Sequence, residues 1–202
     1  MGERSPLFRC AAIVLAAGQS QRMGQDKLAA PIGGKAMVLH AVDAALAAAV
    51  SPVILVCGPD RDRFTTLLDG RAVFLVPNPD HRSGMASSLS RGVAALPGEA
   101  EGVVVLLGDM PMVTAEVINA LIAHAAQVPD AMAVVPVHGG MRGNPVLLKR
   151  GLFSQMAGLR GDVGARQVLR SARVAELPVD DPAILLDIDT PQELAGLSER
   201  MG

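Results

Sequence analysis

The chain has 202 residues, half of them apolar, and its 18 Lys and Arg against 20 Asp and Glu give a formal net charge of −2. A chain this apolar is not intrinsically disordered, and its near-neutral charge argues against a nucleic-acid-binding protein that relies on a strong positive field. With no Trp, no Tyr and only four Phe, the chain also lacks aromatic surfaces on which single-stranded nucleic acid could stack.

The length of the chain and the lengths of its apolar runs limit the number of domains and the cellular locations that we expect. The length suits a single domain that spans residues 1–202. No apolar run reaches the ~18–20 residues of a membrane span, and the N-terminal residues lack the long apolar segment of a secretory signal. Two cysteines, Cys10 and Cys57, are too few for a disulfide scaffold, and both lie in apolar runs. We therefore expect buried free thiols, a cytoplasmic location, and no membrane or nucleic-acid partner.

Short apolar runs typical of buried strands alternate along the chain with helical stretches rich in Ala and Leu. Strands are expected at 11–16, 53–57, 72–76, 103–107, 132–137, 145–148, 174–177 and 184–188. Helices are expected at 38–49, 61–68, 85–96 and 114–127, with two short helices after the strand at 145–148 and a last helix from Pro191. Repeated strand–helix–strand units predict an α/β fold, a mostly parallel sheet with helices on both faces. The Gly-rich turn at 139–143 and the strand that follows it predict an inserted antiparallel hairpin that gives the sheet a mixed edge.

Ligands of such sheets bind beyond the carboxyl ends of the strands, and the loop LAAGQSQRMGQDK directly follows the first strand. It is not a Walker loop, because five residues separate Gly18 from Gly24 and Lys27 comes three residues later. It is not a dinucleotide fingerprint, because Ser20 stands where the second glycine belongs and Arg22 lies inside the loop. Glycines that turn backbone N–H groups inward, together with two cations, instead predict a polyphosphate site.

Acidic side chains follow two other strands of the predicted sheet. Asp109 ends a buried strand, which places its carboxylate at the rim where Mg²⁺ prefers one or two carboxylates plus phosphate oxygens. Asp187 and Asp189 are two residues apart on a predicted strand end, so both share one face and one of them could complete the metal shell. The alternative is structural: Asp109 could cap the turn before Pro111, and the acids near Thr190 could serve a helix that begins with a capping box.

The loop and five later motifs resemble those of the molybdenum cofactor nucleotidyltransferases, in the same order and over nearly the whole chain. The later motifs are GMASSL from Gly84, GDMP from Gly108, RGNPVLL from Arg142, GDVGAR from Gly161 and DIDTP from Asp187. Within that family the sequence LAAG at Leu15 is more similar to the cytidylyltransferase branch than to the guanylyltransferase branch, which usually has LAGG there. The resemblance implies a Rossmann-like, doubly wound fold. It also implies transfer of CMP from CTP to the terminal phosphate of a molybdopterin-type cofactor, with Mg²⁺ as cofactor and a client molybdoenzyme as a further partner.

The resemblance also assigns expected roles. Arg22, Lys27 and Asp109 would be catalytic, and Asp109 with Asp189 would hold the metal. The nucleotide would be bound by Leu15, Ala16, Ala17, Gly18, Ser20, Gly24, Gly84 and Ser88, and the acceptor by Asn144, Asp162 and Arg166. Simpler interpretations exist for some of these: Ser83 could cap the helix that contains Ser88, Asp162 could be an ordinary N-cap, and Arg166 could face solvent.

Two other functions use the same motifs. One is a transferase of this fold with a sugar or polyol phosphate as acceptor, and the other is a non-catalytic escort of molybdenum cofactor. Intact Arg22, Lys27 and Asp109 favour an enzyme, because a carrier does not need triphosphate-binding groups. The four histidines show no metal-ligand spacing and no G-x-S-x-G elbow is present, so we expect neither a catalytic histidine nor a hydrolase triad.

Overall fold

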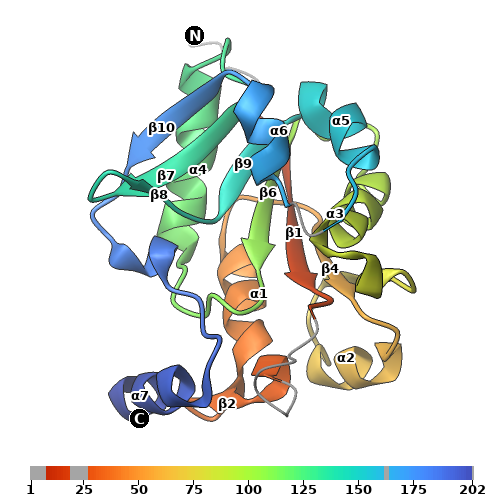
Figure 1. Cartoon of the computed structure of the whole chain (residues 1–202), viewed down its shortest axis with the longest axis vertical. Helices are drawn as coiled ribbons and strands as arrows, with labels where there is room; N and C mark the ends of the chain where they lie inside the picture. Colours follow the sequence, from red (N-terminus) through yellow and green to blue (C-terminus); the bar gives the residue numbers. More distant parts are fainter. Residues whose placement is uncertain (1–7, 19–26, 162–163, 202) are drawn as a thin grey trace, which may run out of the picture.

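The computed structural model describes residues 8–18, 27–161 and 164–201. Within these residues a mixed sheet of eight strands forms the middle layer of the molecule (Figure 1). Seven of the strands follow one another across the sheet in the order β10 (Val174–Pro178), β7 (Ala133–His138), β9 (Val146–Lys149), β6 (Gly102–Leu107), β1 (Cys10–Ala16), β4 (Val53–Cys57) and β5 (Val73–Pro77). The short strand β8 (Met141–Arg142) lies off this path and pairs with β7 alone. Neighbours in this order run parallel, except that β9 is antiparallel to β6 and β7. The fold is therefore the predicted α/β fold with a mostly parallel sheet.

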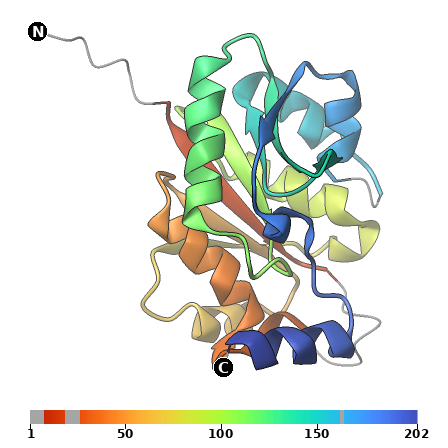
Figure 2. The same ribbon diagram turned by 90° about the vertical axis from the view of Figure 1, so that its left-hand side faces the viewer.

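Strand β1 is buried on both faces because its side chains alternate between two apolar clusters. Ala12 and Val14 belong to one cluster, and Ala11 and Ile13 to the other. The first face is covered by α1 (Met37–Ala47), α2 (Arg61–Leu67) and α4 (Ala115–Gln127), and the second by α3 (Met85–Ala94), α5 (Phe153–Ala157) and α6 (Arg166–Ser171). Figure 2 shows α1 and α4 lying one above the other along the first face. A strand covered on both faces has no need of polar alternation, which explains its continuous apolar sequence.

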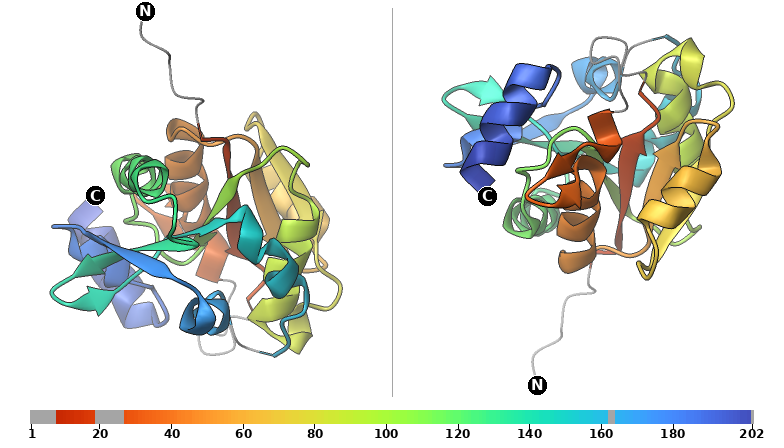
Figure 3. Two further views of the ribbon diagram at one scale, coloured as in Figure 1. Left: turned by 90° about the horizontal axis from the view of Figure 1, so that it is seen from above. Right: turned by 90° about the horizontal axis from the view of Figure 1, so that it is seen from below.

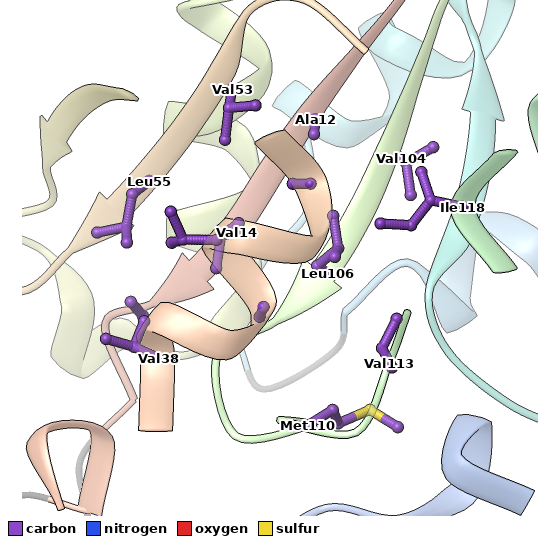
Figure 4. Packing of buried hydrophobic residues seen from close by; sticks show 14 of the residues in the cluster. Ala12, Val14, Val38, Val53, Leu55, Val104, Leu106, Met110, Val113 and Ile118 are labelled. Carbon is purple, nitrogen blue, oxygen red and sulfur yellow. The ribbon is translucent and has the colours of Figure 1, made fainter. Parts of the chain in front are cut away.

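The core over the first face is built from aliphatic side chains. Val14 and Leu106, from the adjacent strands β1 and β6, lie beside Val38 of α1 and Ile118 of α4 (Figure 4). All four side chains are essentially buried. This packing fixes the carboxyl ends of β1 and β6 next to each other, where the loops that carry polar residues begin.

Both cysteines are free and buried, as the sequence predicts. Burial raises the pKa of the Cys10 thiol to about 12 and that of the Cys57 thiol to about 11. Both therefore remain protonated and act as small apolar side chains of the sheet. Among the helices of the described residues, none combines the length and the apolar character that a membrane crossing requires.

Two expectations about strands are wrong. Residues 184–188 do not form a strand: a 3₁₀-helix, η4 (Pro182–Leu185), occupies the start of this segment, with the Asp181 carboxylate accepting from the Ala183 N–H at 2.9 Å. Pro182 favours this start because it has no N–H to give to a sheet. The antiparallel strand β9 lies inside the sheet between β6 and β7, and not at a mixed edge.

A small hairpin, not expected from the sequence, links the first loop to the C-terminal helix. Its strands β2 (Pro31–Ile32) and β3 (Lys35–Ala36) are joined by two glycines with φ of 54° and 77°, as a tight hairpin turn requires. The helix α7 (Pro191–Met201) packs beside β2 (Figure 3). Ile32 is fully buried here against Ile188 and Leu197. The short 3₁₀-helix η1 (Lys27–Ala29) thus lies next to the segment that enters α7.

Two backbone hydrogen bonds hold η4 and the segment after it to the loops next to β9 and β6. The Asn144 N–H donates to the Ile184 carbonyl at 2.8 Å, and the Ile188 N–H donates to the Asp109 carbonyl at 2.9 Å. Gly143 makes the first contact possible, because a Cβ there would overlap the Ile184 carbonyl oxygen. Residues 185–189 are thereby fixed beside the end of β6.

Gly92 allows α3 to approach the sheet, and we expect Gly92→Ala to destabilise the protein. A Cβ at this position would lie 2.9 Å from Ile13 Cγ2 and 3.1 Å from a methyl of Val56. Overpacking of this kind costs about 1–3 kcal/mol, more than the ~1 kcal/mol that Ala gains over Gly in a helix. The free energy of unfolding in urea measures the difference.

Gly196→Ala is the matched control, because within the described residues no atom outside the helix lies within 4 Å of a Cβ built at this position in α7. It should leave stability unchanged or raise it by up to ~1 kcal/mol. An unfolding free energy of Gly92→Ala equal to that of the wild type would contradict the close packing of α3.

Candidate active site

A cavity of about 320 Å³ opens at the carboxyl ends of β1 and β6. Its lining comes from four segments of the chain: Leu15, Ala17 and Gly18 after β1, Lys27 and Leu28 of η1, His81, Arg82, Gly84, Met85 and Ser88 around η2 (His81–Ser83) and α3, and Leu107 and Asp109 after β6. A larger hollow of about 680 Å³ lies against β5 and α2, but its lining is mostly apolar and contains no carboxylate. The smaller cavity is therefore the one that combines a carboxylate with cationic and hydroxyl side chains.

The pairing of β1 with β6 brings Asp109 to this cavity. Leu15 lies opposite Leu107 in the parallel register, and the Gly108 N–H donates to the Leu15 carbonyl at 2.9 Å. A Cβ at Gly108 would lie 3.1 Å from that carbonyl oxygen and 3.2 Å from a Val38 methyl, so glycine lets the chain turn closely against β1. The first and fourth predicted strands are neighbours, as the position of Asp109 beside the first loop requires.

Lys27 joins two carboxylates from distant parts of the chain. Its Nζ donates to Asp109 Oδ2 at 2.8 Å and to Asp189 Oδ1 at 2.6 Å. The Lys27 side chain is only 13% exposed, whereas Asp109 is 24% and Asp189 44% exposed. Burial lowers the pKa of the Lys27 ammonium, but its hydrogen bonds and charge interactions with the two aspartates outweigh this, and its pKa is raised. Lys27 is therefore a cation at neutral pH.

Asp189, and not Asp187, faces this ion pair. Asp187 is exposed, and the segment that carries both is not a strand. The predicted capping box is present: the Glu193 carboxylate accepts from the N–H groups of Asp189 at 2.8 Å and Thr190 at 2.9 Å, and Thr190 Oγ1 accepts from the Glu193 N–H at 3.2 Å. Because Glu193 and Thr190 cap α7, the Asp189 carboxylate is directed to Lys27.

Ser88 is held at the cavity by Asn78, a buried residue that is not predicted from the sequence. Asn78 is fully buried after β5, and its Nδ2 donates to Ser87 Oγ at 2.8 Å and Ser88 Oγ at 2.9 Å. Its Oδ1 accepts from the Asp80 N–H at 3.0 Å. Asn78 thus links the end of β5 to the first turn of α3. The feature of the sequence that points to Asn78 is its position in a polar turn directly after an apolar run.

The first turn of α3 also lines the cavity. Gly84 is the N-cap, with φ of 104°, and no side chain caps this helix. The alternative in which Ser83 caps the helix is wrong, because Ser83 Oγ donates to the Asp80 carbonyl at 2.7 Å. His81 and Arg82 line the cavity as well. The prediction that no histidine is catalytic concerns its chemical role and not its position.

Asn144 and Arg166, the two expected acceptor-side residues that the structure describes, are not part of the cavity lining. Asn144 is half-buried and holds Ile184 through its backbone, and Arg166 is exposed at the start of α6. Arg142 donates to Glu176 at 2.7 Å. Ala16, expected at the nucleotide, instead packs into the core. Four further predicted site residues lie outside the described residues: Ser20, Arg22, Gly24 and Asp162.

The donor set at Asp109 and Asp189 fits a hard divalent cation. Their carboxylate oxygens already bracket one positive group at hydrogen-bond distance. In the part of the chain that the structure describes, no group of three or more His, Cys, Asp or Glu could hold a metal by itself. Two carboxylates completed by phosphate oxygens are what Mg²⁺ takes in nucleotide sites, whereas softer metals prefer Cys and His.

Comparison with known proteins shows the family to which the chain belongs. Residues 12–177 match the family model of the MobA-like NTP transferase domain. The purine catabolism protein PucB of Bacillus subtilis is 33% identical over 195 residues, with 90% of this chain and 92% of that protein covered. The molybdenum cofactor cytidylyltransferase of Escherichia coli is 27% identical over 189 residues, with 93% and 95% covered.

Solved structures resemble the chain over nearly its full length. The crystal structure of a homologue of Mycobacterium tuberculosis Rv0371c from Mycobacterium sp. strain JC1 has a TM-score of 0.83 and 28% identity, covering 96% of this chain and 97% of that one. Rv0371c of M. tuberculosis H37Rv in complex with manganese has a TM-score of 0.75 and 28% identity, covering 95% and 98%. The described cavity with its lysine and two aspartates is thus part of a nucleotidyltransferase fold, and the chain belongs to the MobA-like NTP transferase domain family.

Proposed function

We propose that the protein is a divalent-metal-dependent cytidylyltransferase that moves CMP from CTP onto the terminal phosphate of a molybdopterin-type cofactor and releases pyrophosphate. The observation that carries the proposal is the meeting of Lys27, Asp109 and Asp189 beside a cavity lined by Ala17 and Ser88. The E. coli relative supports the choice of nucleotide and acceptor through its similarity over 93% of this chain. The reaction would take place in the cytoplasm, and a client molybdoenzyme would receive the product.

The chemistry needs positioning and charge neutralisation more than proton transfer. A phosphate monoester has a second pKa near ~6, so an acceptor oxygen is already ionised at neutral pH. That oxygen attacks the α-phosphorus of CTP, the bond between the α-phosphorus and the bridging oxygen to the β-phosphate breaks, and pyrophosphate leaves with the electron pair. No side chain therefore has to remove a proton, and the proposed reaction needs no histidine as a general base.

The chain's own residues supply the charges for this step. Asp109 and Asp189 would hold Mg²⁺, which when bound neutralises the oxygens of the α-phosphate. Lys27 would bind the phosphates of the triphosphate, and Arg22 from the first loop would assist it at the leaving pyrophosphate. The Ser88 hydroxyl accepts from Asn78, so its own proton can be donated to an acceptor atom of the base or the ribose.

Two alternatives remain and one assay separates them. A purified protein that releases pyrophosphate from CTP and Mg²⁺ only when molybdopterin is added supports the proposal. Release with a sugar or polyol phosphate, but not with molybdopterin, identifies a transferase with another acceptor. Binding of molybdopterin without any pyrophosphate release identifies an escort.

Removal of the Asp109 charge should abolish most of the activity while leaving the fold intact. Asp109→Asn should lower kcat/KM by about 10²–10³, the usual effect of one lost electrostatic contact to the transition state. Steady-state pyrophosphate release measures it. Asp187→Asn is the matched control, since Asp187 is exposed nearby, and it should behave as the wild type. Near-normal turnover of Asp109→Asn in Mg²⁺ would reject the role.

A bulkier residue at Gly143 should weaken the metal site at a distance. In Gly143→Ala the new Cβ overlaps the Ile184 carbonyl, so the segment that carries Asp189 must shift. We expect the Mg²⁺ concentration for half-maximal activity to rise about 10–100-fold, as when a support of a metal ligand is lost, and activity to recover at high Mg²⁺. Gly98→Ala is the control, because among described residues nothing lies within 4 Å of a Cβ there. An unchanged Mg²⁺ requirement of Gly143→Ala would contradict the anchoring.

The choice of base should depend in part on Ala17, which is 6% exposed and lines the cavity. Its methyl group narrows the space beside a base, which suits the single ring of cytosine better than guanine. We expect the wild type to prefer CTP over GTP, and Ala17→Gly to reduce that preference by no more than about 10–200-fold, the limit for one methyl-sized group. Competing turnover of both nucleotides with one acceptor measures the ratio. Equal use of GTP by the wild type, or an unaltered preference in the variant, would contradict the assignment.

A further inference from the structure

We propose that Lys27 is the resident cation of the Asp109–Asp189 pair in the substrate-free protein, and that it excludes a divalent metal until the phosphates of a nucleotide draw its ammonium away. The inference rests on the proposed function in one respect, the assignment of both aspartates as metal ligands. It adds an order of binding, in which the nucleotide binds first and the metal binds after Lys27 has left the two carboxylates.

The first argument is competition for the position between the two carboxylates. The Lys27 ammonium takes Oδ2 of Asp109 and Oδ1 of Asp189 at 2.8 and 2.6 Å. A divalent ion held by both carboxylates at once would lie between them, where the Lys27 ammonium already lies with its side chain only 13% exposed. Each carboxylate keeps a second oxygen, so what the two cations compete for is the position between the carboxylates and the charge of the pair.

The second argument is charge. Two carboxylates attract a divalent ion strongly, but the Lys27 ammonium compensates part of their negative charge and lies between them. A bound triphosphate supplies several negative charges to which the ammonium can move. The carboxylates then regain their full charge at the moment when phosphate oxygens are available to complete the metal shell.

The third argument is which parts can move. Asp109 follows the close turn at Gly108, and Asp189 is fixed by the Glu193 cap and by the hydrogen bond of Ile188 to the Asp109 carbonyl. Lys27 is a point charge on a flexible four-carbon stem. The exchange can therefore proceed by rotation of the Lys27 side chain, while both carboxylates stay in place.

The test measures Mn²⁺ binding to the nucleotide-free protein, from the paramagnetic resonance signal of the free ion. We expect Lys27→Met to bind Mn²⁺ more tightly than the wild type, by about 5–150-fold, the usual range of coupling between two sites. Lys27→Arg keeps a cation and should bind as weakly as the wild type. Lys35→Met is the matched control, since Lys35 pairs at 2.9 Å with Asp43, which keeps Arg71 at 2.7 Å. It removes the same charge elsewhere and should bind Mn²⁺ as the wild type does.

A second measurement uses the wild type alone and holds even if Lys27→Met does not fold. The ¹⁵N signal of the Lys27 ammonium should change when α,β-methylene-CTP is added without metal, and Mn²⁺ should then bind more tightly. The inference is overturned if nucleotide-free wild type and Lys27→Met bind Mn²⁺ equally, or if the ammonium signal does not respond to the analogue. Neither measurement involves an acceptor or turnover. A protein that passes both yet never transfers CMP refutes the proposed function alone.

Discussion

One ammonium group between two carboxylates joins three parts of the chain that are far apart in sequence. Lys27 follows the first strand, Asp109 ends the fourth strand of the main parallel series, and Asp189 precedes the last helix. Two carboxylates brought close together at a half-buried sheet edge repel each other unless a cation lies between them. Lys27 supplies such a cation among the described residues, and the same contact ties η1 to the residues that precede α7.

Around this contact the backbone provides most of the precision. Gly108 lets β6 end tightly against β1, Gly143 lets the turn before β9 approach Ile184, and Glu193 turns the start of α7 so that Asp189 is available. The core itself consists mainly of Ala, Val, Leu and Ile side chains, which fill space without specifying a ligand. A site that acts on phosphates by charge needs no aromatic surface, which agrees with a chain that has neither Trp nor Tyr.

The sequence predicts the parallel sheet because each central strand is continuously apolar and each is followed by a helix. It predicts Asp109 at the rim because Asp109 comes just after an apolar strand, and it predicts a phosphate-binding role for Lys27 because Lys27 ends a Gly-rich loop that follows the first strand. It does not decide between Asp187 and Asp189, since alternation along a strand would put both on one face and only the capped start of α7 separates them. The apolar run at 184–188 imitates a strand, and the insertion of β9 between β6 and β7 depends on contacts across the whole sheet. The role of Asn78 cannot be predicted from the sequence, because a single buried polar residue does not alter the hydrophobic periodicity from which strands and helices are predicted.

The capped start of α7 has a consequence for how the active site comes into existence. Lys27 and Asp189 are 162 positions apart, and Asp189 reaches its place through a helix start that itself needs Glu193. The residues up to the end of β10 include every strand of the main sheet and all the residues that line the cavity, but neither Asp189 nor α7. The pairing of Lys27 with both aspartates therefore depends on residues that are synthesised after the sheet and the cavity lining are complete in sequence.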